Sequence, residues 1–129
     1  MSADEIRPED AWPLPPAWMW SCQKCAELYR TMKRVQEQTE ELRLTGERGI
    51  DYDPMDRNVT SQMSLAEHMA AAHLELLPAW DPDCATCKSH RAAIAREAGE
   101  SDRAAVIARF GNEHRARHAF APPRAVGLM

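Results

Sequence analysis

The fold of this chain is most constrained by a ten-residue pattern that occurs twice. PAWMWSCQKC at residues 16–25 and PAWDPDCATC at residues 78–87 share the form P-A-W-x-x-x-C-x-x-C. Each copy is followed further along by Glu-His and a second His, in EHMAAAH (67–73) and EHRARH (113–118). Because these features recur in the same order, the sequence indicates two diverged copies of one structural module.

The repeat also places the expected module boundaries. We expect a first module at residues 14–77 and a second at residues 78–120, with Pro78 ending the first and opening the second. Residues 1–13 are expected to form a flexible N-terminal arm, and residues 121–129 a flexible tail.

Apolar residues recur at intervals of three and four in both modules, which predicts amphipathic helices. Residues 47–60 contain Gly, Pro, Asn and Asp without a period, so they predict a loop between the two helices of the first module. Gly99 separates the two helices of the second module. The predicted fold is all-α, with two tandem helical-hairpin modules. The expected helices cover approximately residues 25–46, 64–77, 84–98 and 101–118.

The cysteines and histidines of the repeat have the spacing of metal ligands. A C-x-x-C pair at the start of a helix brings both sulfurs together, and the helix N-terminus favours the thiolate. Histidines separated by three to five residues are typical zinc ligands, and an antiparallel hairpin returns them level with the cysteines of the same copy. We therefore predict two zinc ions per chain, each closing the open end of one hairpin. The predicted ligands are Cys22, Cys25, His68 and His73 in the first site, and Cys84, Cys87, His114 and His118 in the second.

Other groupings of the same residues are open at this point. His68 and His73 are close in sequence to Cys84 and Cys87 and could pair with them. All four cysteines could form one site, or the C-x-x-C pairs could do dithiol redox chemistry, although no βαβ pattern surrounds them. His90 belongs to neither copy, and we expect it at the surface.

The composition agrees with a core that needs a metal. The apolar fraction is an ordinary 44%, but there are only two Phe and two Tyr among 129 residues, so the core is modest. The N-terminus lacks the pattern of a signal peptide, and no apolar stretch approaches the ~18 residues of a membrane span. We expect a cytoplasmic protein without membrane contact, where reduced cysteines favour metal binding over disulfides.

The ligand set resembles that of zinc-finger modules with two Cys and two His. The resemblance covers the ligands alone. Between each C-x-x-C pair (called a knuckle below) and its histidines lie 42 residues in the first copy and 26 in the second, against about twelve in the ββα finger. The ββα fold and its mode of reading DNA are therefore not implied. Four protein ligands would close each site, which predicts structural zinc and no enzymatic activity.

Two tryptophans suggest a role in binding another protein. Trp18 and Trp80 are repeat equivalents and are expected to support the hairpin cores, whereas Trp12 and Trp20 have no counterpart in the second copy. Exposed aromatic residues often anchor interfaces, so Trp12 and Trp20 are candidate partner-binding residues. We expect a small zinc-stabilised adaptor or regulator.

An alternative is a regulatory protein that binds DNA or RNA through its second half. Residues 1–83 carry a net charge of −8, whereas residues 84–129 carry +4. Basic residues in the range 84–124 could contact phosphates, although a solvated helix face is an equally simple reading. The candidates for this contact are Lys88, Arg91, Arg115 and Arg117.

Overall fold

The structure, a computed structural model, describes residues 11–45, 54–97 and 99–127. Within these ranges the chain forms helices and no strand, which confirms the prediction of an all-α fold. The elements are η2 (Ala17–Ser21), α1 (Gln23–Thr45), α2 (Pro54–Ala72), η3 (Leu74–Leu76), α3 (Ala85–Arg96), α4 (Asp102–Arg117) and α5 (Pro123–Gly127).

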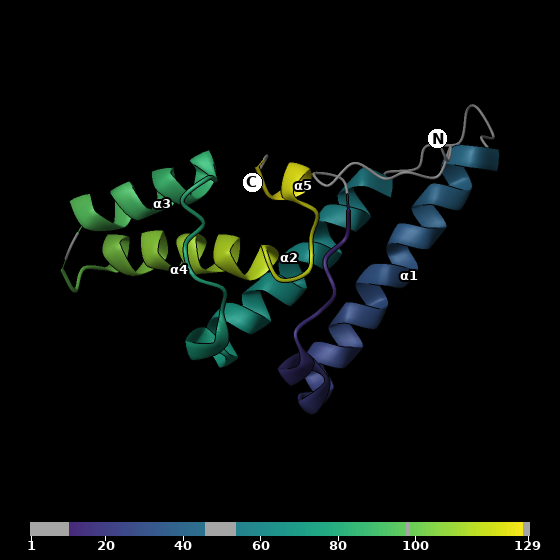
Figure 1. The fold of residues 1–129 in the computed structure, drawn as a ribbon, viewed down its shortest axis with the longest axis horizontal. Helices are drawn as coiled ribbons and strands as arrows, with labels where there is room; N and C mark the ends of the chain where they lie inside the picture. The colour runs from purple at the N-terminus through teal and green to yellow at the C-terminus, as the bar shows by residue number, and fades with distance from the viewer. Residues whose placement is uncertain (1–10, 46–53, 98, 128–129) are drawn as a thin grey trace.

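The long helices pack as two hairpins, as predicted. Figure 1 shows α1 beside α2, and α3 beside α4. The turn of the second hairpin contains Gly99 at a φ of 143°, in a region that favours glycine. Ser101 then caps α4, because its hydroxyl oxygen accepts a hydrogen bond of 3.1 Å from the Ala104 N–H.

The two hairpins are joined through contacts between α2 and α4. The facing surfaces carry small residues, since Ala70 and Ala71 of α2 and Ala105 and Ala108 of α4 line a hollow of about 500 Å³. One hydrophobic core then takes side chains from both hairpins. It contains Met19, Cys25, Met32, Leu65, Ala66, Met69, Leu77, Ala116, Ala119, Phe120, Ala121 and Val126.

The end of the chain differs from the flexible tail expected over residues 121–129. Ala121 is 2% exposed, Val126 is 0% exposed, and α5 packs against α3. The physical reason is that apolar side chains next to the hydrophobic core gain more by burial than a short segment loses in chain entropy. Residues 128–129 lie outside the described residues.

The loop predicted over residues 47–60 is shorter at its C-terminal end than expected. α2 begins at Pro54, so residues 54–60 are helical, while residues 46–53 lie outside the described residues. Proline is suited to the first position of a helix, because the N–H it lacks has no partner there. Of the predicted N-terminal arm, residues 1–10 also lie outside the described residues.

The two phenylalanines allow a matched test of this packing. Phe120 is 0% exposed in the shared core, whereas Phe110 is 48% exposed on α4. We expect Phe120→Ala to lower the free energy of unfolding by about 3–5 kcal/mol, because it leaves a cavity. Phe110→Ala should cost less than about 1 kcal/mol. Urea unfolding followed by circular dichroism measures both, and equal losses would contradict the buried position of Phe120.

Candidate metal centres

The first centre begins with a cysteine at the start of α1. The Cys22 carbonyl oxygen accepts a hydrogen bond of 3.0 Å from the Ala26 N–H, so Cys22 caps the helix. Its Sγ accepts a second hydrogen bond, of 3.4 Å, from the Cys25 N–H. The C-x-x-C spacing thus places one sulfur at the cap and the other inside the first turn, where both face the same point.

The second centre repeats this local geometry. Cys84 is the N-cap of α3, and its Sγ accepts a hydrogen bond of 3.4 Å from the Cys87 N–H. Its carbonyl oxygen accepts from the Lys88 N–H at 3.1 Å. The sequence repeat is therefore also a repeat of backbone and sulfur geometry.

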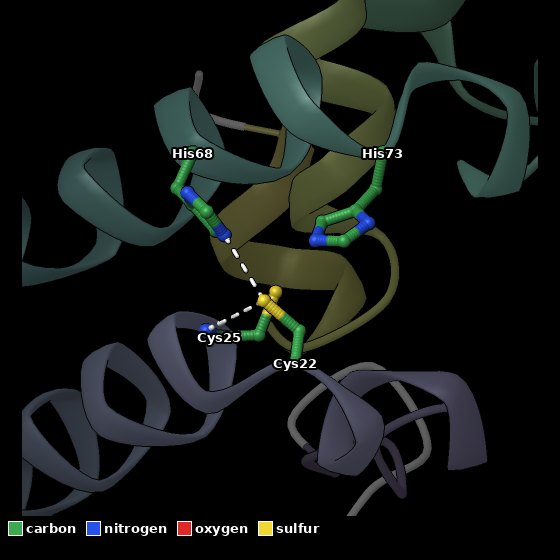
Figure 2. Close-up of side chains that lie close together, drawn as sticks. All are labelled: Cys22, Cys25, His68 and His73. Carbon is green, nitrogen blue, oxygen red and sulfur yellow. Dashed lines mark hydrogen bonds between the residues drawn. The ribbon is translucent and has the colours of Figure 1, made fainter.

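Two histidines complete the first centre from the end of α2. Figure 2 shows the His68 and His73 rings reaching toward the sulfurs of Cys22 and Cys25. His68 Nε2 lies 3.5 Å from Cys22 Sγ. His73 lies just beyond the helix, with φ −131° and ψ 35°, and its ring centroid is 5.0 Å from that of Trp18.

The histidines of the second centre come from the last turn of α4 and from its C-cap residue. His114 Nε2 lies 3.5 Å from Cys84 Sγ, and His118 Nε2 lies 3.2 Å from Cys87 Sγ. The two imidazole nitrogens are 3.3 Å apart. His118 directly follows the last residue of α4, at φ −60° and ψ −22°, so its backbone continues the helix.

The structure groups the eight side chains as the repeat predicts. In each group, one ligand atom from every residue lies within 4.8 Å of the others. The sequence alternatives of pairing His68 and His73 with Cys84 and Cys87, or of joining all four cysteines, do not match this grouping.

The distances within each group fit a tetrahedral metal site. With zinc–sulfur bonds of about 2.3 Å and zinc–nitrogen bonds of about 2.0–2.1 Å, tetrahedral geometry places sulfur and nitrogen about 3.5 Å apart and two nitrogens about 3.3 Å apart. One sulfur–nitrogen distance of 3.5 Å in each centre, and the nitrogen–nitrogen distance of 3.3 Å in the second, have these values, while Cys87 Sγ and His118 Nε2 are closer, at 3.2 Å. Each group could therefore hold one metal ion.

One polar atom of the first centre has no partner within the protein. His73 Nε2 is buried and makes no hydrogen bond. Burying an imidazole nitrogen without a partner costs free energy, which a metal bond or a hydrogen bond would offset. A metal ion is one such partner in a site that already contains two sulfurs and a second imidazole.

Burial keeps three of the ligand histidines in the state that metal binding requires. It lowers the pKa of His114 to about 4, and it also lowers the pKa of His118 and of His68. These imidazoles are therefore neutral near pH 7, with a lone pair for a metal.

The two sulfurs of a knuckle differ in their surroundings. The hydrogen bond from the Cys25 N–H lowers the pKa of the Cys22 thiol, which favours its thiolate. Burial instead raises the pKa of Cys25 to about 12 and also raises the pKa of Cys87. A bound cation would offset that burial and stabilise the inner thiolates.

The two candidate partner-binding tryptophans lie in different surroundings. Trp12 is half-buried against the hydrophobic core, and the Lys33 ammonium lies 4.4 Å from its ring centroid. This position differs from the exposed one expected for it, because the extended proline-rich entry lays the ring on α1. Trp20 is 49% exposed and meets Tyr29 edge to face at 5.3 Å.

The four candidate phosphate contacts do not share one exposed surface. Lys88 and Arg91 are exposed on α3, whereas Arg117 is only 8% exposed. Arg115 is engaged inside the protein, because its Nε–H donates to the Pro78 carbonyl oxygen at 2.8 Å. Arg115 is thus a structural residue, a role that sequence reasoning missed because charge alone does not reveal a backbone partner, and burial withdraws Arg117 from the surface.

Arg115 also holds the start of the second module. Its guanidinium carbon lies 5.4 Å from the centroid of the Trp80 ring. Trp80 in turn lies close to Gly111 of α4, where a Cβ would be 3.0 Å from the ring. The second P-A-W copy therefore packs the segment before Cys84 against α4, the helix that carries His114.

Comparisons with known proteins return no similarity on which a family assignment could rest. No family model, curated protein or solved structure matches the chain. The likeness to zinc fingers is thus a likeness of ligand set alone. Among the described residues, no helix combines the length and the apolar character needed to cross a membrane.

A ligand substitution and a nearby control test the second centre. Cys87→Ser should lower the metal content by one ion per chain, because a hydroxyl replaces a thiolate ligand. His90→Ala is the control, since the His90 ring lies 5.1 Å from that of His114 but is not part of the ligand group. Metal analysis of the purified proteins should find full content in His90→Ala. Loss of metal from both variants, or from neither, would contradict the assigned ligands.

Proposed function

We propose that the protein binds two zinc ions, one in each centre, and that both serve to hold the fold. The observation that carries this proposal is the convergence of two sulfurs and two imidazoles in each group, within 4.8 Å of one another. A set of two thiolates and two imidazoles in tetrahedral spacing favours zinc among the common divalent ions.

The arrangement favours a structural role over a catalytic one. A catalytic zinc ion normally has three protein ligands and an open position for water, whereas each group here offers four. Structural zinc would also compensate for a small core. The largest fully buried side chains are one Phe, three Met and a Leu, together with His114, Val126 and two cysteines.

Zinc analysis combined with chelation tests the proposal. We expect two zinc ions per chain in the purified protein, and a large loss of helical circular dichroism when EDTA removes both. Helicity should return when zinc is added back, which separates metal loss from irreversible damage. A chain that binds no zinc, or that keeps its full helicity after complete removal, would overturn the structural-zinc assignment.

We further propose that the zinc-held scaffold acts as an adaptor that binds another protein. Support comes from apolar side chains that flank the ligands of the first centre along the chain. Trp20, Leu74 and Leu76 are 49%, 47% and 50% exposed. Exposed apolar residues gathered near one site are typical of a contact surface for a partner.

A substitution at Trp20 tests the adaptor role. Trp20→Ala should reduce capture of a specific partner at least about tenfold, since an aromatic anchor contributes ~2 kcal/mol or more to an interface. Phe110→Ala removes a similarly exposed aromatic side chain from α4 and should leave capture unchanged. Tagged protein is incubated with extract of the source cells, and captured proteins are identified by mass spectrometry. Equal capture by Trp20→Ala and the unaltered protein would exclude Trp20 as an anchor.

A further inference from the structure

The two centres hold their last histidine in different ways. In the second, His114 and His118 are four residues apart, and the backbone of His118 is still helical. In the first, His68 and His73 are five residues apart. Side chains five residues apart on a helix point about 140° apart, so His73 reaches the cluster only because α2 ends before it.

The first centre is also more open to solvent. Cys25 is its one buried ligand, whereas both Cys87 and His114 are buried in the second centre, with 1% and 0% exposed. A hollow of about 270 Å³ lies beside the first centre, lined by residues 71–76, His73 among them. Water or a small chelating molecule can therefore approach the first centre more easily than the second, chiefly at the partly exposed His68, since His73 Nε2 is itself buried.

The second centre is more completely preformed. Its three close contacts, of 3.2 to 3.5 Å, link all four ligand side chains from Cys84 through His114 and His118 to Cys87. In the first centre, the close contact between cysteine and histidine is that of Cys22 with His68. Ligands already held in position lose less freedom when the ion binds, so they hold it more tightly.

We propose that the first centre is an exchangeable zinc site, while the second keeps its ion. This inference rests on the proposed function, since it requires that both centres bind zinc. Exchange begins at His73: an incoming donor gives a lone pair to the zinc ion, and the imidazole lone pair of His73 leaves it. Once the ion departs with the incoming ligand, Cys22 and Cys25 each take up a proton from water, and no electron is transferred.

The structural consequence of release is local. Cys25 belongs to the hydrophobic core, and as a neutral thiol it packs like a small apolar side chain. The residues that follow η3 are fixed to α4, because Arg115 donates a hydrogen bond to the Pro78 carbonyl oxygen and lies over the Trp80 ring. Leu77 is also anchored, because it is buried in the hydrophobic core, so the segment that gains freedom is the stretch from His73 to Leu76. Leu74 and Leu76 lie in this stretch, so zinc exchange would alter the surface proposed to bind a partner.

The unaltered protein provides the main test. The two-zinc protein is treated with EDTA, and samples are taken over time, alkylated with iodoacetamide, and analysed by native and peptide mass spectrometry. We expect a one-zinc species to accumulate, with Cys22 and Cys25 alkylated and Cys84 and Cys87 protected. The first zinc ion should leave at least about tenfold faster than the second, which is the size of effect that ligand support has on metal binding.

The outcomes separate this inference from the proposed function. A chain that takes up no zinc overturns both. Two zinc ions that leave at one rate, or earlier alkylation of Cys84 and Cys87, overturn the exchange site and leave the zinc sites in place.

Matched variants test the role given to His73. His118→Ala removes the corresponding ligand of the second centre and should bring the slow release close to the fast one. His73→Ala should speed the fast release and leave the slow one unchanged. Circular dichroism of each loaded variant checks that the helices are intact. A slow release that is altered by His73→Ala, or unaltered by His118→Ala, would overturn the assignment of the two phases.

Discussion

The structure depends on the meeting of two cysteine and two histidine side chains at the open end of each hairpin. The first sulfur of each knuckle caps a helix, and the second lies in the first turn. The partner helix of the hairpin then returns two imidazoles to the same point. Without a cation, this arrangement buries a thiol and leaves His73 Nε2 unpartnered. With a cation, the same groups become ligands, and the hairpin is closed at the end opposite its turn.

The two hairpins nevertheless make one body. Met69 from α2, Ala116 from α4 and Phe120 from the segment after α4 all lie in one core. The helices α2 and α4 contact each other, and their small residues line the hollow between the hairpins. The first module supplies the methionines and leucines of this core and the end of the chain supplies Phe120 and Val126, so the core does not follow the boundaries of the repeat.

The grouping of the eight cysteines and histidines could be predicted from the sequence, because it rests on residue types and spacings that occur twice. Two C-x-x-C pairs and two histidine pairs in matched order specify residue types, spacing and pairing together. The helices were also predictable, since apolar periodicity is local. The start of α2 at Pro54 was missed because proline at a helix start and proline in a loop look alike in a sequence.

Burial that depends on distant residues could not be predicted in the same way. Phe120 and Val126 are buried because they pack in one core with residues of η2, α2 and α4. The sequence around each of them does not show these distant contacts. Arg117 is a similar case: its charge indicated a surface, whereas the packing around the end of α4 covers it. Trp12 and Trp20 are a further case: both rings contact α1, at Lys33 and Tyr29, but only Trp12 also packs against the hydrophobic core.

The spacing of the histidines explains how two equivalent modules come to differ. One additional residue between His68 and His73 turns the second imidazole away from the helix face that carries the first. The chain restores the ligand position by ending α2 at Ala72, and this ending places Leu74 and Leu76 in a short exposed connector. In the second module, the shorter spacing keeps His118 on the line of α4, and the segment that follows packs into the core. A difference of one residue thus changes the backbone support of a ligand and the surface beside it.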